Sequence, residues 1–124
     1  MLDILCVADE RELRGLLADI AEEGGHRLTT VARTALLEEL RGSQQYAAVI
    51  WEADPYNKEG VAIPALREVR AEDPRIPIVL CTARAPATFN GALAELGLEH
   101  LRLGEIGFTP SLLEILRRIE SERR

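Results

Sequence analysis

Strand-like runs of hydrophobic residues alternate with helix-like segments along the whole chain, and this alternation constrains the fold more than any other feature. The runs cover residues 2–7, 28–31, 46–51, 76–81 and 98–103. Short apolar runs bounded by polar or turn residues are typical of buried strands, whereas leucines and isoleucines spaced three or four positions apart are typical of helices. Strands that alternate with helices over short connections predict right-handed crossovers and a parallel sheet covered on both faces.

Glycine and proline mark the expected ends of the helical segments. Gly24 and Gly25 follow the first, Gly42 the second, Pro74 the third and Gly97 the fourth. These residues stop helices because glycine adopts the left-handed cap conformation and proline cannot continue the hydrogen-bond ladder.

The last helix has a distinct start signal, Thr109 followed by Pro110. We expect Thr109 at the N-cap and Pro110 in the first helical position, where the N–H that proline lacks would be unpaired anyway. No linker, repeat or low-complexity segment interrupts the pattern, so we expect one α/β domain over residues 1–124, a doubly wound sheet with five strands and five helices.

The charge balance excludes several classes of function. The chain has 21 acidic residues against 15 Lys and Arg, for a net charge of −6. Affinity for DNA comes mainly from clustered Lys and Arg, so direct nucleic-acid binding is not expected. The basic cluster Arg117, Arg118, Arg123 and Arg124 is interpreted as favourable placement of cations at a helix C-terminus.

The hydrophobic content of 47% argues against disorder, and its distribution argues against a membrane helix. The apolar runs fall far short of the roughly 18 residues that a membrane span needs, and no signal-peptide pattern opens the chain. We therefore expect a soluble cytoplasmic protein. Cys6 and Cys81 both lie in apolar runs and are interpreted as core residues, and His26 and His100 have no partner at metal-ligand spacing.

In a doubly wound sheet, ligands and chemistry belong at the carboxyl ends of the strands. The polar or glycine residues that follow the first, third, fourth and fifth strands are Asp9 and Glu10, Glu52 and Asp54, Thr82 and Arg84, and Gly104 and Glu105. Neither a G-x-G-x-x-G nor a G-x-x-x-x-G-K-[ST] motif follows any strand, so nucleotide binding is not expected.

Three segments together resemble the receiver domain of bacterial response regulators. They are Ile4–Glu10, a hydrophobic strand ending in an acidic pair; Tyr46–Glu52, with Gly60 eight residues beyond Glu52; and Ile76–Arg84. Their order and spacing extend the match over essentially the whole chain. The resemblance implies a flavodoxin-like sheet with strand order 2-1-3-4-5 and a role in two-component phosphorelay signal transduction.

Such receivers hold Mg²⁺ with two acids after the first strand and an Asp after the third, and that Asp accepts a phosphoryl group. A hydroxyl ending the fourth strand and a Lys ending the fifth contact the phosphoryl oxygens. By this resemblance Ala8 and Asp9 stand at the paired acids, Glu52 at the phosphoacceptor and Thr82 at the hydroxyl.

The fifth strand departs most from the family pattern. Gly104 stands at the lysine position, Glu105 replaces the proline that usually follows it, and Leu101 aligns with an aromatic switch residue. The longer arm of Glu52 displaces its carboxylate, and misplacements near one ångström can cost catalysis roughly a hundredfold. These losses predict a receiver that is not phosphorylated and dephosphorylated as the family is. We expect it to have no catalytic residue and no cofactor.

The first functional hypothesis is therefore a pseudo-receiver, a phosphorylation-independent protein-interaction module. The resemblance implies partners such as a sensor histidine kinase or another regulator. It also implies contact or homodimerisation through helix 4, strand 5 and helix 5, here within residues 89–119.

Two residues keep alternative interpretations. Glu52 is either a mimic of a phosphorylated Asp, with Arg84 or Lys58 as the cation that meets its charge, or a solvated loop carboxylate. Asp9 could bind Mg²⁺ together with Glu52, but we favour Asp9 as the cap of the following helix.

A second hypothesis is an active receiver that is phosphorylated at a relocated acid, Asp54, with Mg²⁺. Asp54 precedes Pro55, which is more typical of a turn. A third, a flavodoxin-like cofactor binder, is disfavoured because acidic residues stand where an anionic phosphate would bind.

Overall fold

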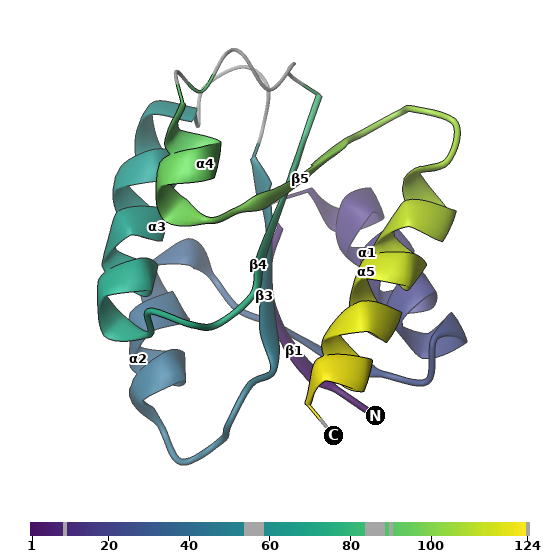
Figure 1. The fold of residues 1–124 in the computed structure, drawn as a ribbon, viewed down its shortest axis with the longest axis horizontal. Helices are drawn as coiled ribbons and strands as arrows, with labels where there is room; N and C mark the ends of the chain where they lie inside the picture. Colours follow the sequence, from purple (N-terminus) through teal and green to yellow (C-terminus); the bar gives the residue numbers. More distant parts are fainter. Residues whose placement is uncertain (9, 54–58, 84–88, 90, 124) are drawn as a thin grey trace.

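Five parallel strands form one sheet in a computed structural model that describes residues 1–8, 10–53, 59–83, 89 and 91–123. The spatial order is β2-β1-β3-β4-β5 (Figure 1), which confirms the predicted doubly wound topology. The strands are β1 (Asp3–Val7), β2 (Arg27–Thr30), β3 (Ala48–Ala53), β4 (Ile78–Thr82) and β5 (Glu99–Arg102).

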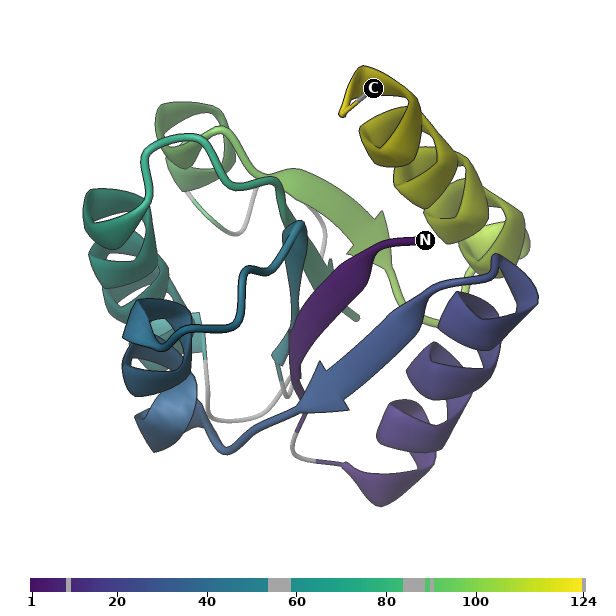
Figure 2. The same cartoon turned by 90° about the horizontal axis from the view of Figure 1, so that it is seen from below.

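Helices cover both faces of this sheet, as Figure 2 shows from below. One layer contains α1 (Arg11–Glu23) and α5 (Phe108–Glu122). The other contains α2 (Leu36–Arg41), which follows a single 3₁₀ turn, together with α3 (Glu59–Glu72) and α4 (Ala92–Leu96).

Alternate side chains of the strands divide the core in two. Ile4, Cys6 and Ile50 pack with α1 and α5, whereas Leu5 and Trp51 pack with the opposite helices. Strands β1 and β4 are covered on both faces and bury nearly all of their side chains, which explains their continuous apolar runs. The edge strands β2 and β5 are partly exposed. Trp51 is almost fully buried in this core.

The third strand is longer than the sequence pattern predicts. We expected the strand to end at Trp51 and a polar loop to begin at Glu52, but β3 continues through Ala53. Parallel pairing with β4, which places Glu52 opposite Cys81, continues the ladder by two residues. The predicted end at Trp51 was wrong because it relied on the polarity of Glu52, and backbone pairing does not depend on side-chain polarity.

The last helix begins earlier than Thr109. Gly107 is at the N-cap with φ +100°, and Phe108 is the first helical residue. Pro110 therefore lies third in the helix rather than first. That position is still in the first turn, where backbone N–H groups have no intrahelical partner, so proline is accommodated.

His26 fastens the turn after α1 to the start of β1. The backbone N–H of Leu2 donates to His26 Nδ1 over 3.0 Å, and the His26 side chain is only 3% exposed. Burial lowers the pKa of His26, against an opposing effect of Glu120. The ring accepts at Nδ1 and is held neutral.

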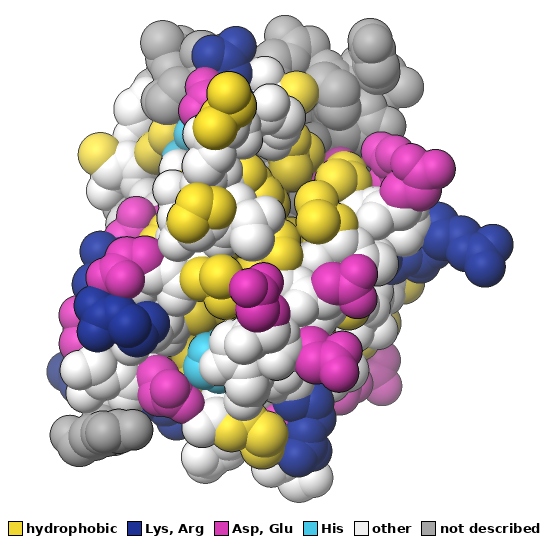
Figure 3. Space-filling view, turned by 90° about the vertical axis from the view of Figure 1, so that its right-hand side faces the viewer, with side chains coloured by type: hydrophobic (Ala, Val, Ile, Leu, Met, Phe, Trp, Pro, Cys, Tyr) yellow, Lys and Arg dark blue, Asp and Glu magenta, His cyan; other side chains and the backbone are white. Residues whose placement is uncertain are grey.

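The surface over α1 and α5 carries apolar side chains among many acids (Figure 3). Leu16 is 41% exposed on α1, and Ile106 is fully exposed between β5 and α5. Within the described residues, no helix combines the length and hydrophobicity that a membrane crossing requires.

Candidate functional site at the carboxyl edge of the sheet

The strand ends meet at the upper edge of the sheet in Figure 1, where the sequence places the candidate site. In register, Glu52 lies beside Cys81, and Thr82 lies beside Arg102. The fold thus brings the predicted Glu52 and Thr82 to adjacent strands. Other candidates fall outside the described residues, namely Asp9, Asp54, Pro55, Lys58 and Arg84.

Glu52 is buried, with 3% of its surface exposed. The interpretation of Glu52 as a solvated loop carboxylate is therefore wrong. Strand alternation puts its side chain on the face of Ala48 and Ile50, under α1 and α5.

Two thiols share the surroundings of Glu52. Burial raises the pKa of Cys6 to about 12, and the negative charge of Glu52 contributes to that rise. Burial, Cys6 and Glu52 also raise the pKa of Cys81. Both thiols stay protonated at neutral pH and are not nucleophiles, which agrees with their interpretation as core residues.

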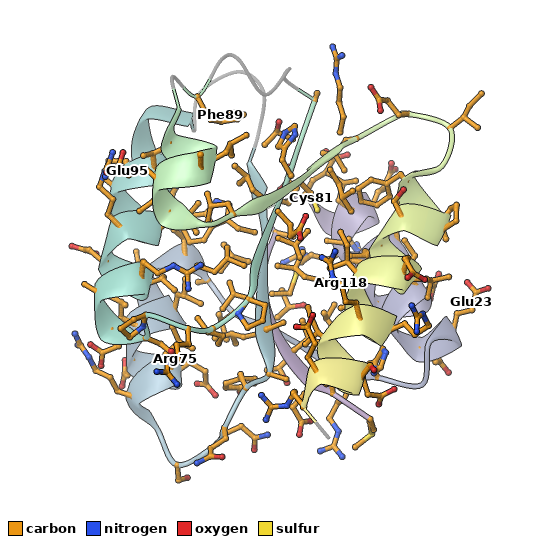
Figure 4. All side chains as sticks on the ribbon, in the orientation of Figure 1. Glu23, Arg75, Cys81, Phe89, Glu95 and Arg118 are labelled. Atoms are coloured by element: carbon orange, nitrogen blue, oxygen red, sulfur yellow. The ribbon has the colours of Figure 1, made fainter. Side chains whose placement is uncertain are left out.

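Thr82 belongs to the opposite face of the sheet. Its side chain is fully buried, and Oγ1 lies 3.1 Å from His100 Nε2, within hydrogen-bonding distance. The His100 ring also packs against Phe89, with ring centroids 5.6 Å apart (Figure 4 shows Phe89 near the start of α4). Thr82, His100 and Phe89 form a continuous chain of contacts from β4 through β5 to the segment before α4.

Comparison with known proteins places this geometry in context. No family model matches the sequence, and neither does any curated protein sequence. Solved structures do match. A response regulator receiver protein from Pseudoalteromonas atlantica has a TM-score of 0.83 at 12% identity, covering 98% of this chain and 99% of that one.

Two further structures match over nearly their whole length. The chemotaxis response regulator CheY4 of Vibrio cholerae has a TM-score of 0.74 at 19% identity, covering 96% and 98% of the two chains. The receiver domain of sensor histidine kinase PA1611 from Pseudomonas aeruginosa, which has a magnesium ion coordinated in its active-site cleft, has a TM-score of 0.73 at 26% identity, covering 94% and 95%. The chain has the fold of a receiver domain.

The residue of β5 beside the Thr82 hydroxyl is His100, and Leu101 is not. Leu101 lies on the other face of β5 and packs against the core under α1 and α5. The sequence comparison missed His100 because it aligned the aromatic switch position with Leu101. Strand alternation was the available signal, because only one of two successive residues can face Thr82.

If His100 takes the aromatic position of the family pattern, the lysine position is displaced as well. It lies three residues after the aromatic position, which is Leu103 instead of Gly104. The Leu103 side chain packs on the core under α1 and α5, and its N–H donates to the Thr82 carbonyl over 2.7 Å. Gly104 has φ +83°, a left-handed conformation that favours glycine. On either count, no amine replaces the lysine of the family pattern.

Arg14 is a cation that the sequence comparison did not single out. It lies one turn into α1, where its N–H donates to the Glu10 carbonyl over 3.0 Å. The positive charge of Arg14 opposes the rise in the pKa of Cys6 that burial and Glu52 produce. Arg14 and Glu52 therefore both act electrostatically on the same buried thiol.

His100 is a neutral ring in this site. Burial and the neighbouring Arg102 lower its pKa, while Glu105 acts in the opposite direction. Arg102 and Glu105 themselves pair at 3.7 Å on the exposed side of the strand end.

The described residues do not fit Mg²⁺ well. Mg²⁺ requires an octahedral set of oxygen ligands, usually carboxylates and waters. Here Ala8 is buried in place of an acid, and Glu52 shares its face with two thiols. Glu10 is exposed at the N-cap of α1 and makes no side-chain cap hydrogen bond. Among the residues described, no group of three His, Cys, Asp or Glu side chains is arranged to hold a metal.

Proposed function

We propose that this receiver domain is a pseudo-receiver, a protein-interaction module of two-component signal transduction that works without aspartyl phosphorylation. The observation that carries the proposal is the buried Glu52 at the phosphoacceptor position, with Leu103 or Gly104 where a lysine would be. Phosphoryl transfer depends on positioned charges that neutralise the transferring group. The described end of β5 supplies no lysine for this role.

The side chain of Thr82 supports the same proposal. In the family pattern this hydroxyl contacts the phosphoryl group, but here it lies at hydrogen-bonding distance from His100, on the face opposite Glu52. The proposed module is not an enzyme, has no cofactor and works in the cytoplasm. Its partners are proteins such as a sensor histidine kinase or another regulator, or a second copy bound through α4, β5 and α5.

A mass measurement tests the absence of phosphorylation. The purified domain is incubated with acetyl phosphate and Mg²⁺, quenched in acid and measured by intact-mass spectrometry. We expect no phosphoryl adduct on the wild type, and none on the Glu52→Asp variant, because restoring the aspartate leaves the lysine missing.

A phosphoryl group on Glu52 or Asp54 would overturn the proposal. Loss of that adduct in Asp54→Asn, but not in Glu52→Gln, would instead identify an active receiver phosphorylated at Asp54. Quenching of Trp51 fluorescence by millimolar Mg²⁺ would independently indicate an occupied metal site, because Trp51 adjoins Glu52 at the end of β3.

A further inference from the structure

The helix α4 has too few residues to hold its own position. It spans five residues between Gly91 and Gly97, both in left-handed conformation. Isolated helices shorter than about 12 residues are marginal in water, so such a helix depends on tertiary contacts. Ala92 and Leu96 bury one side of α4 in the core between the sheet and the layer of α2, α3 and α4.

The first polar contact on α4 comes from Arg67 of α3. Its two terminal nitrogens reach the two carboxylate oxygens of Glu95, Nη1 to Oε1 and, over 3.2 Å, Nη2 to Oε2. Figure 4 labels Glu95 on α4, in front of α3. A two-point contact between a guanidinium and a carboxylate fixes orientation as well as distance.

The second contact comes from Arg70, one turn further along α3. Nε donates to the carbonyl of Leu96 over 2.9 Å, and Nη1 donates to the carbonyl of Ile76 over 2.7 Å. A longer contact of 3.5 Å reaches the Gly97 carbonyl. Carbonyls at a helix C-terminus have no intrahelical partner, so Arg70 satisfies the end of α4 and ties it to the entry of β4.

These contacts lie away from the phosphoacceptor position. Ile76 precedes β4 and Gly97 precedes β5, so both mark the amino edge of the sheet, whereas Glu52 lies at the carboxyl edge. Both arginines are on α3, which packs through Leu66 and Val69 into the core. These polar contacts therefore hold α4 from the end of the sheet opposite the strand-end site, whereas the ring contact of Phe89 with His100 lies nearer that site.

We infer that Arg67 and Arg70 are positioning residues that hold α4 on α3 and present the α4–β5 face in one conformation, whatever occupies the strand-end site. This inference deepens the proposed function, since a module that works without phosphorylation needs its binding face formed in advance. The role of the two arginines in presenting a binding face therefore rests on the proposed function.

Hydrogen exchange of backbone amides tests the inference directly. In Arg70→Met, which keeps the aliphatic stem and removes the donors, we expect amides of residues 92–98 to exchange on the order of tenfold faster. Amides of β1 and α5 should keep their wild-type rates. Arg67→Gln should act on the same amides with a smaller factor.

The chain offers a matched control. Arg117 contacts Glu114 through two nitrogens, at 2.9 and 2.6 Å, but both residues lie on α5. Arg117→Gln removes the same kind of pair without linking two elements, so exchange in residues 92–98 should stay unchanged.

Exchange of residues 92–98 within twofold of wild type in both Arg70→Met and Arg67→Gln would overturn the inference. Acceleration of all elements by the same factor would also overturn it, because that result means only global destabilisation. If Arg70→Met does not fold, Arg67→Gln and Glu95→Gln decide the question alone.

Addition of acetyl phosphate and Mg²⁺ separates this inference from the proposed function. We expect no change in exchange of α4. Faster exchange of α4 under these conditions would overturn the single conformation, whereas a phosphoryl adduct in the mass measurement would overturn the proposed function.

Discussion

The two faces of the sheet end differently at its carboxyl edge. On the face under α1 and α5, Glu52 is buried with the thiols of Cys6 and Cys81. On the other face, the Thr82 hydroxyl lies within hydrogen-bonding distance of His100, which packs against Phe89. The two side chains lie on adjacent strands at the same edge but on opposite faces of the sheet. The difference shows that strand alternation gives two neighbouring polar side chains different surroundings at the same edge of the sheet.

The largest effect on stability is expected from a substitution on the face of the sheet that contains Thr82. Trp51 fills the core of that face at the end of β3 and is almost fully buried. Trp51→Ala should lower the free energy of unfolding by about 3–5 kcal/mol, as removal of a buried aromatic side chain typically does. Urea unfolding followed by circular dichroism measures the loss, and Trp51→Phe should lose clearly less. A loss below about 1.5 kcal/mol for the alanine variant would mean that this face is not packed as described.

The next effect isolates the polar pair on the same face. Thr82→Val keeps the shape and removes the hydroxyl, so it should cost about 1 kcal/mol of unfolding free energy. A double-mutant cycle with His100→Phe should give a coupling of similar size, because each substitution removes the same contact. Additive effects within about 0.3 kcal/mol would show that the two side chains do not interact.

The third prediction concerns pH and compares His100 with His26. The folded-state pKa of each is below the ordinary value of 6.5. The unfolded chain therefore binds more protons below pH 6.5, and the stabilising contribution of each ring is complete above that value. Stability should fall as the pH drops below 6.5 and level off below the folded-state pKa values.

Urea unfolding at several pH values measures this dependence, and His26→Gln and His100→Gln should each flatten the curve. Two-dimensional NMR of the two rings gives the pKa values directly. A ring that titrates above 6.5 would contradict the burial described for that residue.

The smallest effect concerns the face of Glu52. Glu52→Gln removes a negative charge that raises the pKa of Cys6, so that pKa should fall from about 12. Burial is the larger cause and remains, so the thiol should still be protonated at neutral pH. NMR titration of labelled cysteine measures the shift, with Glu105→Gln, on the exposed strand end, as the control. An unchanged Cys6 pKa in Glu52→Gln would place the carboxylate away from the thiol.

Most of the fold could be predicted from the sequence, because buried parallel strands and amphipathic helices leave different periodicities. The strand order followed from the resemblance and is confirmed. The boundaries were less predictable. Glu52 extends β3 through pairing with β4, and Phe108 begins α5 ahead of the expected Thr109. The first depends on a backbone partner elsewhere in the chain. The second depends on local geometry, in which the N–H of Ser111 donates to the Gly107 carbonyl.

The candidate site could be predicted only as a set of strand ends. Its position at the carboxyl edge follows from parallel topology, and the absence of a lysine is evident from the residues themselves. The environment of each side chain was not predictable. Whether Glu52 is buried, and whether His100 or Leu101 meets Thr82, depends on strand register and on what each helix covers.

The sequence by itself determined a doubly wound α/β sheet and a strand-end site that lacks the family's full set of charges, because periodicity and residue type are local properties. Tertiary structure alone decided that Glu52 is buried, that His100 lies against Thr82 and that Arg70 joins the ends of α4 and the start of β4. Arg70 and Leu96 are 26 residues apart along the chain. Contacts over such separations arise from packing between elements, and no local pattern specifies them.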